Sequence, residues 1–325
     1  MLTFLLQLLS ERGILDRMAF KGGTCLRKMF LGNQGRFSTD LDFTGIEEHD
    51  HEDVILAMMG AFDQPFHGIQ FAIPDEGYYE TQDGLSWGVN PTYTHGWNQG
   101  GSEIRLQISR RETPTLPTER RPQIEQSYFR FLPFAPAELT CLALPEILAE
   151  KIRACYQRNK ARDIYDLGTF AARPLDYALI RRLVVLKLWQ ARDAFDPARL
   201  KQKFQDGRDF DWDDLRDLLR RTVVIDKERI TADCVKGFGF LAELTEDERV
   251  LANDRYQREQ AGGQNTRTAC ASLERHCGGT LRLRNSNACI FDIRYFRCRE
   301  HHCNLLIVAV RSMSRCPNKT GLSAT

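Results

Sequence analysis

The sequence predicts an α+β protein in which a mixed sheet with flanking helices is followed by an all-helical domain. Alternating apolar and polar residues mix with helical spacing up to about residue 135, and helical spacing dominates from Pro136 onward. The chain has 325 residues, 42% hydrophobic and 27% charged, which is enough for two domains. We therefore expect a sheet domain over residues 1–135 and a helical domain over 136–261. Residues 262–325 form an atypical cysteine-rich tail whose folding the sequence leaves open.

The first part of the chain begins with an apolar stretch and then a glycine turn. Residues 1–9 are expected to form an amphipathic helix, since the stretch is too short for a membrane span and has no basic leader. This favours a cytoplasmic protein. Gly22, Gly23 and Thr24 then open a short helix with apolar residues at helical spacing.

A strand is expected next, over residues 37–43. Apolar and polar residues alternate there, which places Asp40 and Asp42 on one face and Phe37, Leu41 and Phe43 on the other. A helix is expected over 52–62. Further strands of the same sheet are expected over residues 67–73, 78–88 and 102–112.

The second part should contain helices over residues 145–171, 176–193, 197–205, 211–221 and 238–253. If 145–171 is continuous, Lys151, Arg158, Arg162 and Asp166 fall along one face and line a cleft. The alternative is an ion pair between Arg162 and Asp166, four residues apart on a solvated face.

Charge and cysteine content separate the tail from the rest. Four cysteines lie in the first 260 residues and six in the last 56. The formal net charge is +1, so no global field attracts nucleic acid, and a nucleic-acid site must be a local patch.

Asp40 and Asp42 are the candidate metal ligands. Two carboxylates two residues apart on a strand point the same way, with Cα atoms about 6.6 Å apart. They suit Mg²⁺ or Mn²⁺, and paired metal ions of this kind promote phosphoryl-type transfer. Alone, such a pair is most often a solvated strand face.

The glycine turn is the candidate phosphate site. Without Cβ atoms, Gly22 and Gly23 let backbone N–H groups approach a triphosphate, and the helix N-terminus adds partial positive charge. The Thr24 hydroxyl and Lys28 would complete the cradle. Alone, a turn of this composition is most often only a turn.

The order and spacing of these motifs are more informative, because Gly23 precedes Asp40 by 17 residues. Residues 20–28 (FKGGTCLRK) and 36–43 (RFSTDLDF) resemble the AbiEii family of toxin nucleotidyltransferases, whose relatives include the MenT-type toxins. Residues 144–151 (LPEILAEK), Arg158 and 162–167 (RDIYDL) resemble later motifs of that family, so the resemblance covers about residues 1–250.

The resemblance implies a nucleotidyltransferase fold and a site. Ser38 and Lys151 would contact the nucleotide, with Lys151 at its phosphates. Asp163 and Asp166 would hold the site together or position the base.

It also implies a metal-dependent enzyme that transfers a nucleoside monophosphate from an NTP to an acceptor hydroxyl. The implied acceptor is RNA, such as a tRNA 3′ end. The protein would be the toxin of a toxin–antitoxin or abortive-infection system for phage defence, with a cognate antitoxin. Five basic residues are candidates for RNA phosphates: Arg105, Arg110, Arg111, Arg120 and Arg121.

One position departs from the family pattern. Where many enzymes of this fold carry a third carboxylate, the equivalent strand has Gln107, and an amide is a weaker ligand that cannot act as general base. Glu103 is the alternative, about 13 Å away along a strand. Two other functions therefore stay open: a catalytically impaired nucleotide- or RNA-binding descendant, and a small-molecule nucleotidyltransferase.

Overall fold

The protein is described here by a computed structural model covering residues 1–46, 50–82, 84–96, 98–254, 281–284 and 290–293. Residues 1–254 form one compact unit and residues 255–325 another. In the second unit, β11 (Leu281–Arg284) pairs antiparallel with β12 (Ile290–Ile293). The rest of the cysteine-rich tail lies outside the described residues.

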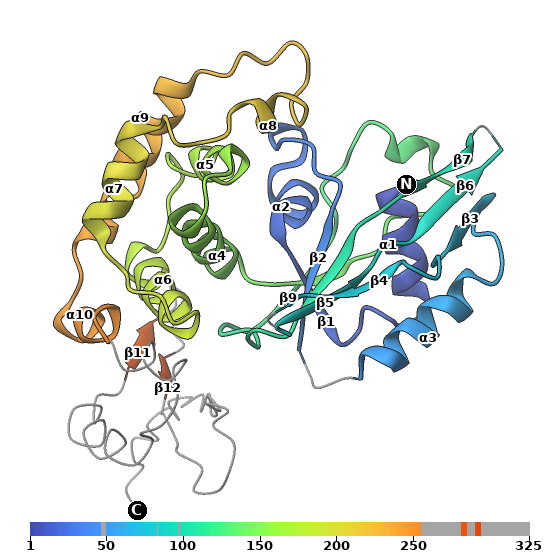
Figure 1. Ribbon diagram of the computed structural model, residues 1–325, viewed down its shortest axis with the longest axis horizontal. Helices are drawn as coiled ribbons and strands as arrows, with labels where there is room; N and C mark the ends of the chain where they lie inside the picture. The colour runs from blue at the N-terminus through green and yellow to red at the C-terminus, as the bar shows by residue number, and fades with distance from the viewer. Residues whose placement is uncertain (47–49, 83, 97, 255–280, 285–289, 294–325) are drawn as a thin grey trace, which may run out of the picture. The chain divides into compact units, whose positions relative to one another are not determined.

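A seven-stranded mixed sheet forms the centre of the described part of the first unit (Figure 1). Its order is β4-β5-β8-β2-β1-β10-β9. The bounds are β1 (Met18–Lys21), β2 (Leu41–Gly45), β4 (Tyr78–Glu80), β5 (Ser86–Val89), β8 (Leu106–Ser109), β9 (Glu119–Arg121) and β10 (Leu139–Cys141). The central strand β2 pairs antiparallel with β1 and parallel with β8. The predicted α+β fold is confirmed.

A second, three-stranded sheet contains β3 (Ile69–Ala72), β6 (Thr92–His95) and β7 (Asn98–Glu103). The sequence prediction that 67–73 joins the same sheet as 78–88 was therefore wrong. The predicted strand over 102–112 was also wrong in extent. A break at Ile104 and Arg105 separates β7 from β8, so the two halves of the segment belong to different sheets.

The helices of the sheet region are α1 (Leu2–Glu11), α2 (Gly22–Cys25) and α3 (His51–Phe62). The sheet region also contains the π-helical turn η1 (Leu26–Leu31) and two 3-10 turns, η2 (Gly32–Gln34) and η3 (Phe129–Phe131). α1 forms over the predicted apolar stretch, but it is not amphipathic as predicted, because the consecutive residues from Leu5 to Leu9 are buried on every face and only Glu11, at its end, is exposed.

The helical part begins at Leu144, after the strand β10 that the helical prediction from Pro136 onward missed. It contains α4 (Leu144–Gln157), α5 (Ala161–Gly168), α6 (Tyr177–Gln190), α7 (Pro197–Asp206), α8 (Asp213–Arg216), α9 (Lys227–Gly237), η4 (Gly239–Ala242) and α10 (Glu246–Ala252). α9 was not predicted from the sequence, and the predicted helix over 238–253 is divided into η4 and α10.

The predicted continuous helix over 145–171 is broken at Arg158. Arg158 has an extended backbone, with φ −141° and ψ 169°, and Lys160 forms a β-bridge with Asp211. The amide of Asp211 donates to the carbonyl of Asn159, which gives the backbone of the break a partner. Helical spacing cannot reveal such a break, because its cause is a contact with a segment fifty residues away.

The core joins the sheet to the helices. Phe20 of β1 stacks on Phe43 of β2 with ring centroids 5.1 Å apart, and Trp87 of β5 is fully buried. α4 adds Ile147, Leu148 and Ile152, which belong to the same cluster. Burial of this kind is the main stabilising contribution to the fold.

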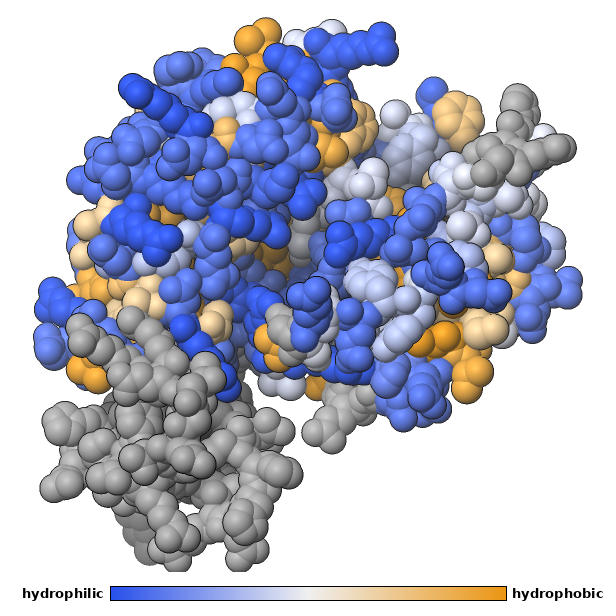
Figure 2. All heavy atoms as spheres, viewed as in Figure 1, coloured by the Kyte–Doolittle hydropathy of each residue, from blue (hydrophilic) through white to orange (hydrophobic). Residues whose placement is uncertain are grey.

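The face of the molecule seen in Figure 2 is mostly hydrophilic, with apolar residues in small separate patches. Phe37 is one of the exposed large residues, at 42% exposure, although the alternation pattern placed it with the buried Leu41 and Phe43. Among the described residues, no helix is long and apolar enough to span a membrane.

Lys28 belongs to the packing of the sheet region. Its ammonium is buried and donates to Thr3 Oγ1 at 2.8 Å, Gln123 Oε1 at 3.3 Å and Tyr128 OH at 3.4 Å. Burial and the neighbouring Arg27 lower the pKa of Lys28 to about 8. All of these hydrogen-bond partners are neutral, and no described carboxylate forms an ion pair with Lys28.

Replacing Lys28 with Met should remove a pH-dependent part of the stability. The folded protein releases this proton near pH 8, whereas an unfolded lysine keeps it to about pH 10.4, so the contribution of Lys28 to stability rises between these values. From pH 7.5 to 9.5 the parent should gain roughly 2 kcal/mol relative to Lys28→Met. Urea unfolding at both pH values measures this.

The control is Lys201→Met, which changes an exposed lysine of α7. It should follow the parent at both pH values. If the free energy of unfolding changes equally with pH in Lys28→Met and the parent, Lys28 is charged and solvated in the folded state.

Candidate active site

The turn between β1 and α2 is packed directly against Asp42. Gly22 has φ +77°, and a Cβ built there would lie 2.2 Å from Asp42 Oδ2. Lys21, the residue before it, is the register partner of Asp42 in the β1–β2 pair. Only glycine combines this backbone conformation with the close approach, so the carboxylate lies against the turn.

The next two residues hold the segment that leads into β2. A Cβ on Gly23 would lie 2.5 Å from Arg36 Nη2 and 3.3 Å from Ser38 Oγ. The Thr24 hydroxyl is buried and donates to the carbonyl of Asp40 at 2.5 Å. The side chain of Thr24 therefore fixes the start of β2, and neither Gly23 nor Thr24 lines the cavity described next.

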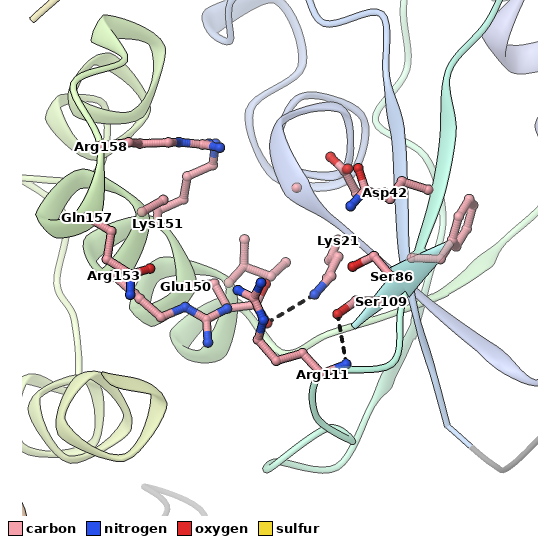
Figure 3. Close-up of a pocket in the computed structure, with 15 residues that line it drawn as sticks. Lys21, Asp42, Ser86, Ser109, Arg111, Glu150, Lys151, Arg153, Gln157 and Arg158 are labelled. Atoms are coloured by element: carbon pink, nitrogen blue, oxygen red, sulfur yellow. Dashed lines mark hydrogen bonds and ion pairs between the residues drawn. The ribbon is translucent and has the colours of Figure 1, made fainter. Parts of the chain in front are cut away.

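A cavity of about 310 Å³ lies between the sheet and the helical part. On the sheet side it is lined by Gly22, Asp42 and Gln107, and on the helical side by Lys151 and Arg158. Figure 3 shows the latter two side chains extending toward Asp42. Figure 3 shows Ser109, Arg111 and Glu150 at the other end of the cavity, and Lys21 extending from beside Asp42 to Glu150.

The Asp42 carboxylate is half-buried and has no hydrogen bond or ion pair with any other described residue. Burial raises the pKa of Asp42, and the ammonium groups of Lys21 and Lys151 offset part of this effect. Asp40, just before β2, accepts from the Thr39 hydroxyl at 3.3 Å. A half-buried carboxylate without a partner is unfavourable, so a cation at this position would stabilise the site.

Gln107 is the neighbour of Asp42 on the next strand. The two residues are register partners in the parallel β2–β8 pair, and both line the cavity. Arg105 Nη2 donates to Gln107 Oε1 at 3.2 Å, and Arg105 Nε donates to the Tyr79 hydroxyl at 3.1 Å. Glu103, the alternative ligand, lies in β7 of the other sheet and is exposed.

These groups fit a hard divalent cation in part. Two carboxylates and an amide oxygen are donors of the right type, and Mg²⁺ is commonly held by one or two carboxylates together with substrate phosphates. Among the described residues, no cluster of three His, Cys, Asp or Glu side chains offers a complete cage. A metal here would therefore need oxygen ligands from a substrate or water.

Lys151 is held by two buried aspartates. Its Nζ lies 3.0 Å from Asp163 Oδ1 and 2.9 Å from Asp166 Oδ2. Burial would lower the pKa of Lys151, but the carboxylates of Asp166 and Asp163 outweigh it and raise the pKa. Lys151 is therefore charged in the cavity wall.

The same two aspartates bind two arginines. Arg36 donates to Asp166 through Nε and Nη2, both at 2.9 Å, and Arg158 donates to Asp163 at 2.7 and 3.1 Å. Burial would raise the pKa of Asp163, but Lys151 and Arg158 lower it well below its usual range. A continuous series of ion pairs therefore runs from Arg36, which lies against Gly23, through Asp166, Lys151 and Asp163 to Arg158 in the cavity wall.

A second buried cluster lies behind the other end of the cavity. Lys187 of α6, only 1% exposed, lies 2.5 Å from Glu146 Oε1, 3.2 Å from Glu112 Oε2 and 3.7 Å from Glu150 Oε1. Burial would raise the pKa of Glu150, but Lys21 and Lys187 lower it to about 2. Lys21 approaches the same carboxylate at 3.3 Å.

The structure brings most of the sequence-predicted residues together. Gly22, Asp42 and Lys151 line the cavity, while Asp163 and Asp166 lie directly behind Lys151. The other predicted residues do not line the cavity: Gly23, Thr24, Lys28, Ser38 and Asp40. Of these, Lys28 directs its ammonium away from the site, to Thr3 and Tyr128. The alternative considered for Arg162, an ion pair with Asp166 on a solvated face, does not form, because Asp166 is buried and its oxygens accept from Arg36 and Lys151.

Three residues of the site were missed in the sequence: Lys21, Arg36 and Glu150. Lys21 and Arg36 carried a usable signal, since each lies within two residues of a predicted motif residue. The sequence around Glu150 gives no such signal, because Glu150 is held in place by Lys187, 37 residues later in another helix.

Removing the charge of Asp163 should destabilise the protein in a pH-dependent way. Asp163→Asn leaves Lys151 with one carboxylate and Arg158 with none, which should lower the free energy of unfolding by about 3 kcal/mol at pH 7. The pKa of Asp163 is lowered on folding, so its stabilising contribution is present above about pH 3.9 and is lost as pH falls further.

Denaturant unfolding at pH 7 and pH 3 tests this. The difference between parent and variant should narrow at pH 3. Asp75→Asn, at an exposed position, is the matched control and should behave as the parent at both pH values. A variant as stable as the parent at pH 7 would contradict the view that this buried cluster holds the site together.

Comparisons with known proteins agree with the geometry. A family model described as the nucleotidyl transferase AbiEii toxin of type IV toxin–antitoxin systems matches residues 3–233. The structure is similar to that of MenT4, a nucleotidyltransferase toxin from Mycobacterium tuberculosis H37Rv, with 32% sequence identity and a TM-score of 0.64. That match covers 79% of this chain and 88% of MenT4.

Two Helicobacter pylori structures, one of them JHP933, are 19% identical and cover 74% of this chain and 92% of their own. Their TM-scores of 0.47 and 0.44 are too low to bear on function. No curated protein sequence matches the chain.

The family match spans well over half of the chain and includes both the glycine turn and the segment of Asp163 and Asp166. The resemblance seen in the sequence is thereby confirmed. The chain belongs to the AbiEii family of nucleotidyltransferase toxins of type IV toxin–antitoxin systems, and it is a nucleotidyltransferase.

Proposed function

We propose that the protein transfers a nucleoside monophosphate from an NTP to a hydroxyl of an RNA acceptor, such as a tRNA 3′ end, and releases pyrophosphate. The observation that carries this proposal is the contact of Gly22 with Asp42 in a cavity whose opposite wall holds Lys151 and Arg158. One wall offers the Asp42 carboxylate for a metal, and the other offers fixed positive charge for phosphates. In this proposal the predicted domains, residues 1–135 and 136–261, supply opposite walls of the site.

Asp40 and Asp42 would hold Mg²⁺ or Mn²⁺, with Gln107 beside them. When bound, such a metal polarises the phosphoryl oxygens and neutralises charge that develops during transfer. The fit to this donor set is partial, which agrees with a metal that takes its remaining ligands from the NTP.

The chain's own residues would position the NTP. The backbone N–H groups of Gly22 and Gly23, at the start of α2, would bind phosphate. The missing Cβ atoms leave room for the side chains of Asp42 and Arg36, and Ser38 lies beside Gly23. Thr24 acts through its hydrogen bond to the Asp40 carbonyl. Lys151, fixed by Asp163 and Asp166, presents its ammonium to the phosphates without needing to reorganise.

As a member of a type IV toxin–antitoxin family, the protein is proposed to have a cognate antitoxin and to act in abortive infection, a form of phage defence. A cytoplasmic location follows from an acceptor such as tRNA. MenT4, the similar structure, is itself described as a toxin.

Replacing Asp42 with Asn should abolish transfer. The amide keeps the size of the side chain but removes the charge that binds metal, and metal catalysis contributes several kcal/mol. Incorporation of labelled nucleotide into RNA, with each NTP in turn and Mg²⁺, measures the effect. NTP binding in the absence of metal should persist, because Lys151 and the glycine turn are unchanged.

Asp53→Asn, at an exposed position of α3, is the control for this change and should retain parental activity. Equal transfer by Asp42→Asn and the parent would remove Asp42 from the proposed chemistry.

Replacing Gln107 with Glu should raise transfer tenfold or more. The new carboxylate would lie beside Asp42 in the β2–β8 register and strengthen metal binding, and a general base typically contributes about 10²- to 10⁴-fold. Without metal the variant should be less stable than the parent, because a further negative charge adjoins Asp42. Transfer assays, and melting with and without Mg²⁺, measure the two effects separately.

Ser102→Glu adds the same charge on β7 of the other sheet and serves as the control. If Gln107→Glu changes neither the rate nor the metal-dependent stability, the position contributes nothing to metal binding.

A further inference from the structure

Three arginines from separate parts of the chain surround the loop of residues 33–37, which precedes β2. Arg27 lies in η1, Arg173 follows α5 and Arg220 follows α8. Each donates through its guanidinium to this loop. The acceptors are three consecutive residues, Gly35 O at 3.3 Å, Gln34 Oε1 at 3.0 Å and Asn33 Oδ1 at 3.0 Å respectively.

The positive charge of these arginines is not neutralised within the described chain. Their loop partners are a carbonyl and two amides, and none of the three forms an ion pair with a described carboxylate. The pKa of Arg27 is lowered, first by burial and also by the nearby guanidinium of Arg220. Like charges held close together without counter-ions favour the binding of an anion.

Most of the basic residues chosen from the sequence differ in this respect. Arg110 pairs with Glu80 at 2.8 Å, Arg120 with Glu138 at 3.5 Å, and Arg121 with Glu119 at 2.8 Å. Paired arginines have already lost much of their attraction for phosphate. The loop arginines are therefore better candidates for a polyanion.

An exposed aromatic ring accompanies the charges. The Arg27 guanidinium lies 4.3 Å from the centroid of the Phe37 ring, and Phe37 is 42% exposed. The amide of Phe37 donates to the Leu218 carbonyl at 2.7 Å, which fixes the loop to the segment that carries Arg220. Arginines interleaved with an exposed ring are typical of surfaces that bind single-stranded nucleic acid, since bases stack on the ring and phosphates meet the guanidinium groups.

The surface is close to the proposed catalytic carboxylates along the chain. Phe37 precedes Asp40 by three residues, so their Cα atoms are at most about 11 Å apart. We propose that Arg27, Arg173, Arg220 and Phe37 bind the backbone and a base of a single-stranded RNA acceptor and direct its end to Asp40 and Asp42. This rests on the proposed function and adds the surface that holds the acceptor.

The test is the binding of a fluorescent single-stranded oligoribonucleotide to the full chain, measured by anisotropy over a range of salt concentrations without NTP. The variant replaces all three arginines with Gln, which can still hydrogen-bond to the loop. Its Kd at low salt should be at least about tenfold weaker than that of the parent. The slope of log K against log salt should become less steep by about 2, because three phosphate contacts are lost and each contributes about 0.7 on a single strand.

Two control variants separate charge from folding. Replacing the exposed Arg12, Arg17 and Arg208 with Gln gives the same change in net charge and should leave Kd and slope unchanged. Replacing Arg27, Arg173 and Arg220 with Lys keeps the charge and should retain the parental slope. Melting temperatures of all variants show whether the fold is retained.

The possible outcomes distinguish this proposal from the one on which it rests. A parent that binds the oligoribonucleotide through these arginines but transfers no nucleotide to it would overturn the proposed reaction and leave the surface supported. A parent that transfers nucleotide to RNA while the Gln variant keeps its Kd and slope would overturn the surface. Failure of the parent to bind the oligoribonucleotide would also overturn it.

Discussion

The buried pairing of Asp163 and Asp166 with three cations is the interaction on which the site depends. Asp166 joins Arg36, next to the glycine turn, to Lys151 of α4, and Asp163 joins Lys151 to Arg158. Ion pairs removed from water are worth little as net stability, because desolvation offsets their attraction. Their effect here is geometric. The aspartates fix the sheet and the helical part so that Lys151 faces Asp42 across one cavity.

The sequence predicted the parts of this arrangement that are local. Gly22, Asp42 and Lys151 belong to short sequence motifs. The glycine turn and Asp42 come together because the turn follows β1, which pairs with β2. The α+β class was predictable for the same reason, since period two and helical spacing are properties of neighbouring residues. The strand β10 and the break at Arg158 were missed because each is fixed by a distant partner, β1 in one case and Asp211 in the other.

Lys28 shows the limit of spacing arguments most clearly. It lies one helical turn beyond Thr24, which suggested a place in the phosphate cradle, yet its side chain is directed to α1 and to Tyr128. Arg27, one residue earlier in η1, points elsewhere and donates to the carbonyl of Gly35. Lys28 and Arg27 are adjacent in sequence but have different surroundings, because neighbouring positions on a helix project in different directions.

The environment of Gln107 connects the acidic and basic halves of the site. Burial raises the pKa of its register partner Asp42, and Lys21 and Lys151 offset part of this effect, while the amide oxygen of Gln107 accepts from Arg105. Electrostatic attraction to Asp40 and Asp42 also helps to raise the pKa of Arg105, after its hydrogen bond to Tyr79. The hydrogen bond to Gln107 therefore holds the Arg105 guanidinium near the carboxylates. The positive charge that a nucleotidyltransferase needs around a triphosphate would then come partly from the protein itself.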